Sequence, residues 1–206
     1  MTSPAIVGGI PVSATTVARL REHLAKLVRW NGAINLVAKS TLAEAWDRHT
    51  TDSAQLLQLA PERPLHWVDL GSGAGFPGLV VAIILAERSP GTRVSLVESD
   101  RRKATFLRET VRALGLSTTV LAERIETTTP LCADVVSARA LAPLEKLLPL
   151  AVRHLAPNGV ALFFKGVTAD SELATVSAAW SFSLERLPSQ TEPSAEILRL
   201  KDLNHV

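Results

Sequence analysis

Residues 66–88 join an apolar strand, a glycine turn and an apolar helix, an order that few folds accommodate. The predicted strand, 66–70, carries Asp69 near its end, and the predicted helix covers 77–88. Three glycines at alternate positions lie between them: Gly71, Gly73 and Gly75. This order builds a nucleotide-type pocket at the carboxyl end of a parallel strand. Glycine suits such a turn because it accepts positive φ and lets a ligand approach the backbone.

The spacing of this turn indicates which ligand to expect. The pattern Asp-x-Gly-x-Gly-x-Gly differs from the dinucleotide pattern Gly-x-Gly-x-x-Gly, whose helix N-terminus faces a pyrophosphate. Asp69 would repel a pyrophosphate, but it suits the cationic amino-acid part of S-adenosylmethionine. Glu98 ends the next predicted strand, 93–98, where a carboxylate can accept both ribose hydroxyls. The other interpretation is that the glycines only let a helix pack closely on a strand, with Glu98 an ordinary strand end.

Strand and helix patterns alternate through the rest of the chain. We predict strands over 119–122, 134–137 and 160–164, and helices over 101–114 and 143–155. One helix and two antiparallel strands, near 181–186 and 195–200, are predicted to follow. The alternation predicts an α/β fold with a doubly wound, Rossmann-like sheet. Together with the turn that suits S-adenosylmethionine, this indicates a sheet of the class I methyltransferase kind. We assign 63–206 to this domain and 1–62 to an N-terminal helical extension.

The extension is predicted to contain two amphipathic helices, over 13–31 and 41–59. Ser13 is a plausible N-cap of the first, whose buried stripe is Val17, Leu20, Leu24, Leu27 and Val28. The apolar face of the second helix is interrupted by His49 and Ser53, with Asp52 one turn from His49. These polar groups either bond to nearby backbone as structural residues or face a cleft against the main sheet.

The carboxyl ends of the predicted strands define a candidate site. Beside Asp69, the glycines and Glu98, they carry Ile125 and Glu126, which are placed to meet an adenine. Arg139 and Lys165 follow the next two strands and could meet a phosphate at the mouth of the cleft. The alternatives are a salt bridge for Arg139 and a solvated strand end for Lys165.

Composition narrows the chemistry further. The 206 residues include no tyrosine, so an Asn-Pro-Pro-Tyr amine-methylation motif is excluded, and no residue cluster has metal-ligand spacing. The single cysteine, Cys132, is expected to be a small buried residue, although a nucleophilic role stays open. Transfer to a ring nitrogen with a free lone pair needs neither a metal nor a strong base. Holding donor and acceptor in line can supply most of the acceleration.

Charge and hydropathy bear on partners and location. Residues 99–124 hold six basic and three acidic side chains, which suits a polyanion but is equally typical of solvated helix faces. No signal peptide and no membrane-spanning apolar run is apparent, so we expect a cytoplasmic protein without a membrane partner. We also expect the protein to be a monomer.

The segment 69–78 resembles the glycine loop of the bacterial small-subunit ribosomal RNA guanine-N7 methyltransferases, also called glucose-inhibited division protein B. Further resemblance covers residues 28–166. Its motifs are Trp30-Asn31-x-x-Ile34-Asn35-Leu36, Arg48-His49-x-x-Asp52-Ser53, Lys103-x-x-Phe106-Leu107, Ser137-x-Arg139-Ala140 and Lys165-Gly166. This chain departs from the family by one extra residue, Ala138, before Arg139, and its last forty residues match weakly.

The resemblance implies transfer of a methyl group from S-adenosylmethionine to N7 of one guanine in 16S ribosomal RNA, free or in the small subunit. The implied cofactor contacts are Gly71, Gly73, Phe76, Ile125, Glu126 and Arg139, to which the glycine turn and the strand ends add Asp69, Gly75 and Glu98. Candidate catalytic residues are Asn35, His49, Asp52, Arg139 and Lys165, with Ser53 beside them. Candidate RNA contacts are Arg48, Arg101, Arg102, Lys103, Arg139 and Lys165.

Three other functions stay open at this point. The same fold could methylate a small molecule or a protein, because fold does not set substrate. The chain could also be an RNA- or ribosome-binding factor that only senses the cofactor. A dinucleotide oxidoreductase is disfavoured by Asp69 and by the glycine spacing.

Overall fold

A seven-stranded sheet forms the centre of the protein, in the order β5-β4-β3-β6-β7-β9-β8. The structure, a computed structural model, describes residues 4–62 and 64–206. The strands are β3 His66–Leu70, β4 Arg93–Val97, β5 Thr118–Leu121, β6 Ala133–Arg139, β7 Leu155–Lys165, β8 Trp180–Pro188 and β9 Glu196–His205. The first five run parallel, and β9 lies antiparallel between β7 and β8. The predicted α/β class and its antiparallel edge are confirmed.

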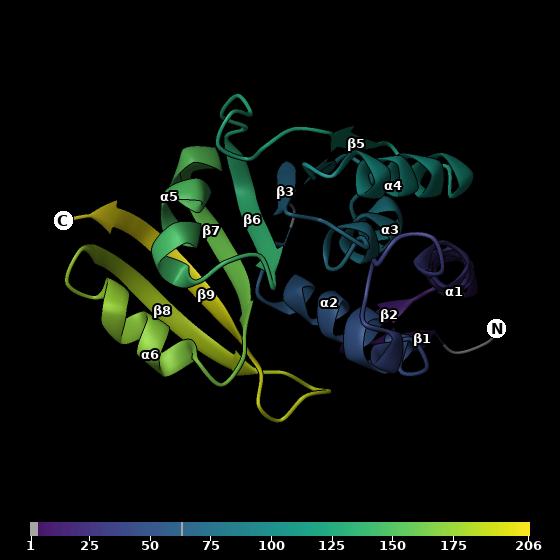
Figure 1. Cartoon of the computed structure of the whole chain (residues 1–206), viewed down its shortest axis with the longest axis horizontal. Coiled ribbons are helices and arrows are strands. Elements are labelled where there is room, and N and C mark those ends of the chain that lie inside the picture. Colours follow the sequence, from purple (N-terminus) through teal and green to yellow (C-terminus); the bar gives the residue numbers. More distant parts are fainter. Residues whose placement is uncertain (1–3, 63) are drawn as a thin grey trace.

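Helices cover both faces of this sheet (Figure 1). Helices α1 Ala14–Asn31, α3 Gly78–Arg88 and α4 Arg101–Ala113 pack on one face. Helices α5 Leu144–His154 and α6 Ala169–Val176 pack on the other. Helix α3 is apolar on every side, and its residues 78–85 are all buried, as predicted. The N-terminal segment shares one apolar core with α3 and the sheet, because Leu20, Leu27 and Leu56 belong to the same buried cluster as Trp67 and Ile83.

The strand order reverses between β3 and β6. From β3 the chain proceeds to β4 and β5 on one side, and then returns to β6 and β7 on the other. Ligands of doubly wound sheets bind at such a switch point, outside the carboxyl ends of the strands. The residues after β3, β4 and β6 therefore define where a site is expected.

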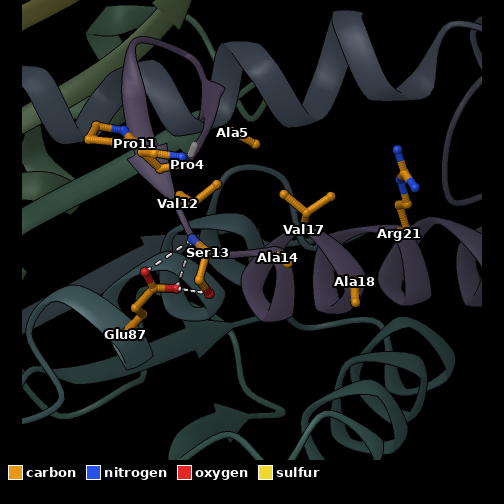
Figure 2. Close-up of a pocket in the computed structure, with 10 residues that line it drawn as sticks. All are labelled: Pro4, Ala5, Pro11, Val12, Ser13, Ala14, Val17, Ala18, Arg21 and Glu87. Carbon is orange, nitrogen blue, oxygen red and sulfur yellow. Dashed lines mark hydrogen bonds between the residues drawn. The ribbon is translucent and has the colours of Figure 1, made fainter. Parts of the chain in front are cut away.

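Helix α1 begins where the sequence predicts. The Ser13 hydroxyl accepts a hydrogen bond from the Thr16 N–H, and it donates one to the Glu87 carboxylate at 2.6 Å. Glu87 lies at the end of α3, and Figure 2 shows its hydrogen bonds with Ser13. Because Thr16 also donates to Glu87, one carboxylate joins the two helices. The predicted buried stripe is partly wrong. Val28 is 56% exposed, whereas the polar His23 on this helix is fully buried.

Replacing Ser13 by alanine is expected to lower the free energy of unfolding by about 1 kcal/mol. The substitution removes the cap of α1 and one hydroxyl bond to Glu87. Urea unfolding of Ser13→Ala measures this loss. Thr15→Ala, at an exposed position in the same turn, is the matched control and should change the unfolding free energy by less than about 0.5 kcal/mol. Equal effects of the two substitutions would contradict a capping role.

The prediction of one continuous α-helix over 41–59 is wrong. A 3-10 turn, η1 Lys39–Thr41, is followed by a separate helical segment. This segment consists of a π-helical stretch, η2 Trp46–Thr51, then α2 Asp52–Gln55 and a 3-10 turn, η3 Leu56–Gln58. Widened π turns shift side chains around a helix and are frequent at functional sites. Hydrophobic periodicity cannot reveal them, because the apolar spacing changes by only one residue.

Two further features differ from expectation. A small antiparallel hairpin, β1 Ala5–Val7 and β2 Ile10–Val12, precedes α1. Its turn uses Gly8 and Gly9 at positive φ, and apolar residues beside a Gly-Gly pair could have indicated it. Cys132, expected to be buried, is exposed.

Among the described residues, we find no helix with the length and apolar character needed to cross a membrane.

Candidate functional site at the switch point

A cavity of about 380 Å³ opens at the carboxyl ends of β3, β4 and β6. This volume lies within the usual range for small-molecule sites. Five of the predicted cofactor residues line it: Gly71, Gly73, Glu98, Ile125 and Glu126. The remaining lining residues are Val97, Ser99, Lys103, Arg124, Ala140, Leu141, Ala142, Lys146 and Leu150. The sequence analysis did not predict most of these lining residues. It chose Arg139 because that residue ends a predicted strand, and the same argument applies to Ala140, the next residue.

The glycine turn forms one wall of the cavity. The N–H groups of Gly71 and Ser72 donate to the carbonyl of Val97, which ties the turn to β4. Gly71, Gly73 and Gly75 all have positive φ, between 51° and 87°. A Cβ atom on Gly71 would lie 2.5 Å from the end of the Leu141 side chain, so glycine lets Leu141 pack directly against the turn.

Glu98 holds this turn in place. Its carboxylate accepts hydrogen bonds from the Gly73 N–H and the Asp100 N–H, each at 2.8 Å. The side chain is mostly buried, yet it lines the cavity. Because each carboxylate oxygen has a second lone pair, Glu98 can still accept a hydrogen bond from a ligand hydroxyl.

Asp69 lies behind the turn and is not among the residues that line the cavity. One oxygen accepts from the Ser137 hydroxyl at 2.7 Å, and the other from the Gly78 N–H at 3.2 Å, at the start of α3. Burial raises the pKa of Asp69 to about 7, against these hydrogen bonds, which lower it. The predicted contact with a cationic ligand stays a prediction. The observed role of this carboxylate is to join β3, β6 and α3.

Asp69→Asn is expected to become more stable relative to the unmodified protein as pH rises. In the unfolded chain an aspartate titrates near 4, and in the folded protein the pKa of Asp69 is about 7. The folded state of the unmodified protein therefore binds the proton more tightly than the unfolded state does. Its free energy of unfolding falls as the pH rises from 4 to 7 and then levels off. Urea unfolding at pH 5 and pH 8 should show the difference between the two proteins change by about 2–4 kcal/mol. Parallel profiles would contradict a titrating Asp69.

A second group of predicted residues lies beside this cavity, around Arg139 at the end of β6. The Arg139 guanidinium donates to the Arg48 carbonyl at 2.9 Å, lies 3.7 Å from the Asp52 carboxylate and stacks over the Phe164 ring. Its second terminal nitrogen, Nη1, is buried without a partner among the described residues. Asp52 is 1% exposed and also accepts from the Ser189 hydroxyl in the β8–β9 loop. No sequence motif pointed to that loop.

Phe76, at the end of the glycine turn, packs between two histidines. Its ring centroid lies 5.0 Å from that of His23 and 4.9 Å from that of His49. Burial and the neighbouring charges of Arg139 and Arg48 lower the pKa of His49 to about 4, so its ring is neutral at pH 7. His49 also contacts the Thr41 hydroxyl at 3.2 Å, and Ser53 donates to the His49 carbonyl. These contacts agree with the structural interpretation of this segment, and its exposure to a cleft stays a prediction.

The remaining candidates differ in their surroundings. Asn35 is exposed in the loop after α1. Arg101 and Arg102 are exposed at the start of α4, Lys103 lines the cavity, and Arg48 pairs with Glu192 at 2.9 Å. Lys165 is buried, and its ammonium donates to the Ala142 carbonyl and the Glu172 carboxylate. We therefore revise its predicted contacts with RNA and with the reacting groups, since this ammonium already has two hydrogen-bond partners.

A larger and more open depression of about 860 Å³ lies between the β1–β2 hairpin and α1. Its lining is mainly apolar, and its polar members include Arg21 and the Glu87–Ser13 pair, whose groups are engaged at the start of α1 (Figure 2). It lies at the far end of α3 from the glycine turn. Because convergent free polar groups are what fix a ligand, the smaller cavity is the better candidate.

Comparison with known proteins identifies the family of this chain. A family model described as GidB, rRNA small subunit methyltransferase G, matches residues 16–198. The chain belongs to this family. A protein named ribosomal RNA small subunit methyltransferase G from Cereibacter sphaeroides is 51% identical over all 206 residues, and the match covers the whole of both chains. A protein of the same name from Rhodospirillum centenum is 52% identical over 192 residues. The second match covers 93% of this chain and 87% of the relative.

Solved structures of methyltransferases resemble this chain in fold. A SAM-dependent methyltransferase from Aquifex aeolicus superposes with a TM-score of 0.60 at 13% identity, covering 86% of this chain and 97% of that one. The N-methyltransferase NodS from Bradyrhizobium japonicum, in complex with S-adenosyl-L-homocysteine, gives 0.59 at 16% identity, with coverages of 87% and 97%. At such identities the likeness shows the class I methyltransferase fold alone.

Proposed function

We propose that this chain transfers a methyl group from S-adenosylmethionine to N7 of a guanine in 16S ribosomal RNA. The observation that carries the proposal is the family match over 16–198, which contains the glycine turn, Glu98, Ile125 and Glu126 at one cavity. We further propose that the protein acts as a monomer in the cytoplasm, where its RNA substrate is made.

The residues at the cavity suit this cofactor. Glu98 can accept a ribose hydroxyl with its free lone pairs, and Ile125 offers an apolar surface to an adenine. The exposed carboxylate of Glu126 can accept from the exocyclic amine. The unpartnered Nη1 of Arg139 can donate to the carboxylate of the amino-acid part, and Asp69 favours its ammonium from behind the turn. When bound, S-adenosylmethionine supplies a methyl group on a sulfonium.

The polar groups on the other side of Arg139 are assigned to the acceptor. Guanine N7 carries a free lone pair, so the protein has no proton to remove before the attack. The neutral ring of His49 agrees with this, since a histidine with a pKa of about 4 is a weak base. We assign His49 and Asp52 to the shape and polarity of the acceptor side, and Asn35, exposed in the loop after α1, to the RNA side of the cleft. Catalysis then depends mainly on holding the base in line with the methyl group.

Exposed cations are assigned to the RNA backbone. Arg101 and Arg102 extend from the start of α4, next to Lys103 at the rim of the cavity. Arg48 is partly exposed on the side of the site near Arg139. Phosphate contacts position the nucleic acid without reading sequence, so binding should weaken steeply with added salt.

The decisive experiment incubates the purified protein and labelled S-adenosylmethionine with small ribosomal subunits, free 16S RNA and transfer RNA in parallel. Digestion then identifies the labelled nucleoside. We expect 7-methylguanosine in small-subunit samples only, and the better of the two small-subunit substrates shows the preferred assembly state. Cofactor binding without label in any RNA would overturn the proposal and favour a small-molecule or protein substrate, or a cofactor sensor. Tight binding of NAD instead would favour an oxidoreductase.

A further inference from the structure

The loop between β6 and α5 forms one wall of the proposed cofactor cavity. Its residues Ala140, Leu141 and Ala142 all line the cavity, and the Leu141 side chain packs against Gly71. Ala140 has a φ of 51°, a conformation that residues other than glycine seldom adopt. A short loop in such a conformation needs support from its surroundings to keep one shape. The cavity wall therefore depends on whatever holds 140–144 in place.

A buried ion pair supplies that support. The Lys165 ammonium, at the end of β7, donates to the Ala142 carbonyl at 2.8 Å and to the Glu172 carboxylate at 2.7 Å. Glu172, on α6, in turn accepts from the Leu144 N–H and from the Thr168 hydroxyl, each at 2.8 Å. The Lys165 and Glu172 side chains are only 8% and 18% exposed. Both charges thus hold backbone groups on the two sides of Pro143.

The position of this pair is not explained by stability alone. Burying two charges costs desolvation energy, and well-packed apolar residues often serve as well. Lys165 bonds to the backbone of Ala142 in the cavity wall, and Glu172 bonds to the backbone of Leu144, where the same loop enters α5. The exposed pair on the same helix makes no such bond. Asp170 pairs with Arg186 at 2.7 Å at the surface, with the Asp170 side chain 82% exposed. The buried pair holds the cavity wall, and the exposed pair only joins α6 to β8.

We propose that Glu172 and Lys165 are positioning residues that fix the 140–144 wall of the cofactor cavity. The proposal rests on the function proposed above, because it assigns the cavity to S-adenosylmethionine. It gives α6, in the region where the family motifs are weak, a role in cofactor binding through the β6–α5 loop. Loss of either charge leaves the loop free to move away from Gly71. The cofactor must then order this loop when it binds, which lowers its affinity.

Calorimetry with S-adenosylhomocysteine tests this role on Glu172→Ala and Lys165→Met. We expect the Kd for this ligand, and the KM for S-adenosylmethionine, to rise about tenfold in both variants. The KM for small ribosomal subunits should change less than twofold. Lys165→Arg, which keeps the charge, should recover most of the affinity. Asp170→Ala, which removes the exposed pair on the same helix, is the matched control and should leave the Kd unchanged.

Other results would overturn the proposal. If Glu172→Ala lowers the melting temperature but keeps the Kd within twofold, the pair is structural only. An equal loss with Asp170→Ala would also reject it, since the effect would then come from α6 as a whole. If Glu172→Ala does not fold, Glu172→Gln, which keeps the side-chain volume, decides by the same criterion. Failure of the unmodified protein to bind S-adenosylhomocysteine would instead reject the cofactor site itself.

Discussion

Gly73→Asp is expected to weaken S-adenosylhomocysteine binding at least about 100-fold while the protein stays folded. The Gly73 N–H donates to Glu98 at 2.8 Å, so a carboxylate at this position would lie in the cavity close to a second carboxylate. It would fill space that the ligand needs and repel the ligand's carboxylate. Aspartate tolerates the φ of 51° better than most residues, and the nearest atom to a Cβ is 3.7 Å away, so the fold can accept it.

Gly73→Ala is the matched control, because it adds a Cβ at the same backbone position without charge. We expect less than about a tenfold loss of affinity from it, with a small cost from the positive φ. Calorimetry measures the affinities, and circular dichroism checks that both variants are folded. Binding by folded Gly73→Asp that matches the unmodified protein would show that the cofactor lies elsewhere. Gly71→Ala is unsuitable as a control, since its Cβ would lie 2.5 Å from Leu141.

Arg139→Ala is expected to lower methyl transfer at least about 100-fold and to destabilise the fold by about 2–4 kcal/mol. The activity falls because the unpartnered Nη1 is assigned to the cofactor carboxylate. The stability falls because Asp52, 1% exposed and 3.7 Å from the guanidinium, would be left as a buried charge without its cation. Steady-state methyl transfer to small ribosomal subunits and urea unfolding measure the two effects separately.

Two further variants separate the roles of Arg139. Arg139→Lys keeps the charge but loses the planar fork and its stacking over Phe164, so it should recover stability more than activity. Adding Asp52→Asn to Arg139→Ala removes the stranded carboxylate and should restore part of the stability, which a double-mutant cycle quantifies. Additive stability effects of the two substitutions would show that the two groups do not interact. Full activity of folded Arg139→Ala would reject its assignment to the cofactor.

Local sequence was sufficient for the architecture and for one wall of the site. Strand–turn–helix order, glycine spacing and apolar periodicity predicted β3 to β7, the helices that follow them and the antiparallel edge, because each depends on neighbouring residues. The rule that parallel strands end at one edge placed Gly71, Gly73, Glu98, Ile125 and Glu126 together. These residues share a cavity because of the order of the strands in the sheet, and the alternation of strands and helices in the sequence already implies such a sheet.

Tertiary structure decided the partners of each polar side chain. Lys165 follows a strand just as Arg139 does, yet it is held by Glu172 from α6, seven residues away in sequence but in another element. Arg139 is paired with Asp52, and Asp52 with Ser189, across 137 residues of chain. The π-helical stretch at Trp46–Thr51 and the burial of His23 against Phe76 likewise depend on packing between distant segments. Hydrogen bonds and desolvation act over a few ångströms in space. Periodicity along the chain gives the face on which a residue lies, and only the packed fold determines which groups meet there.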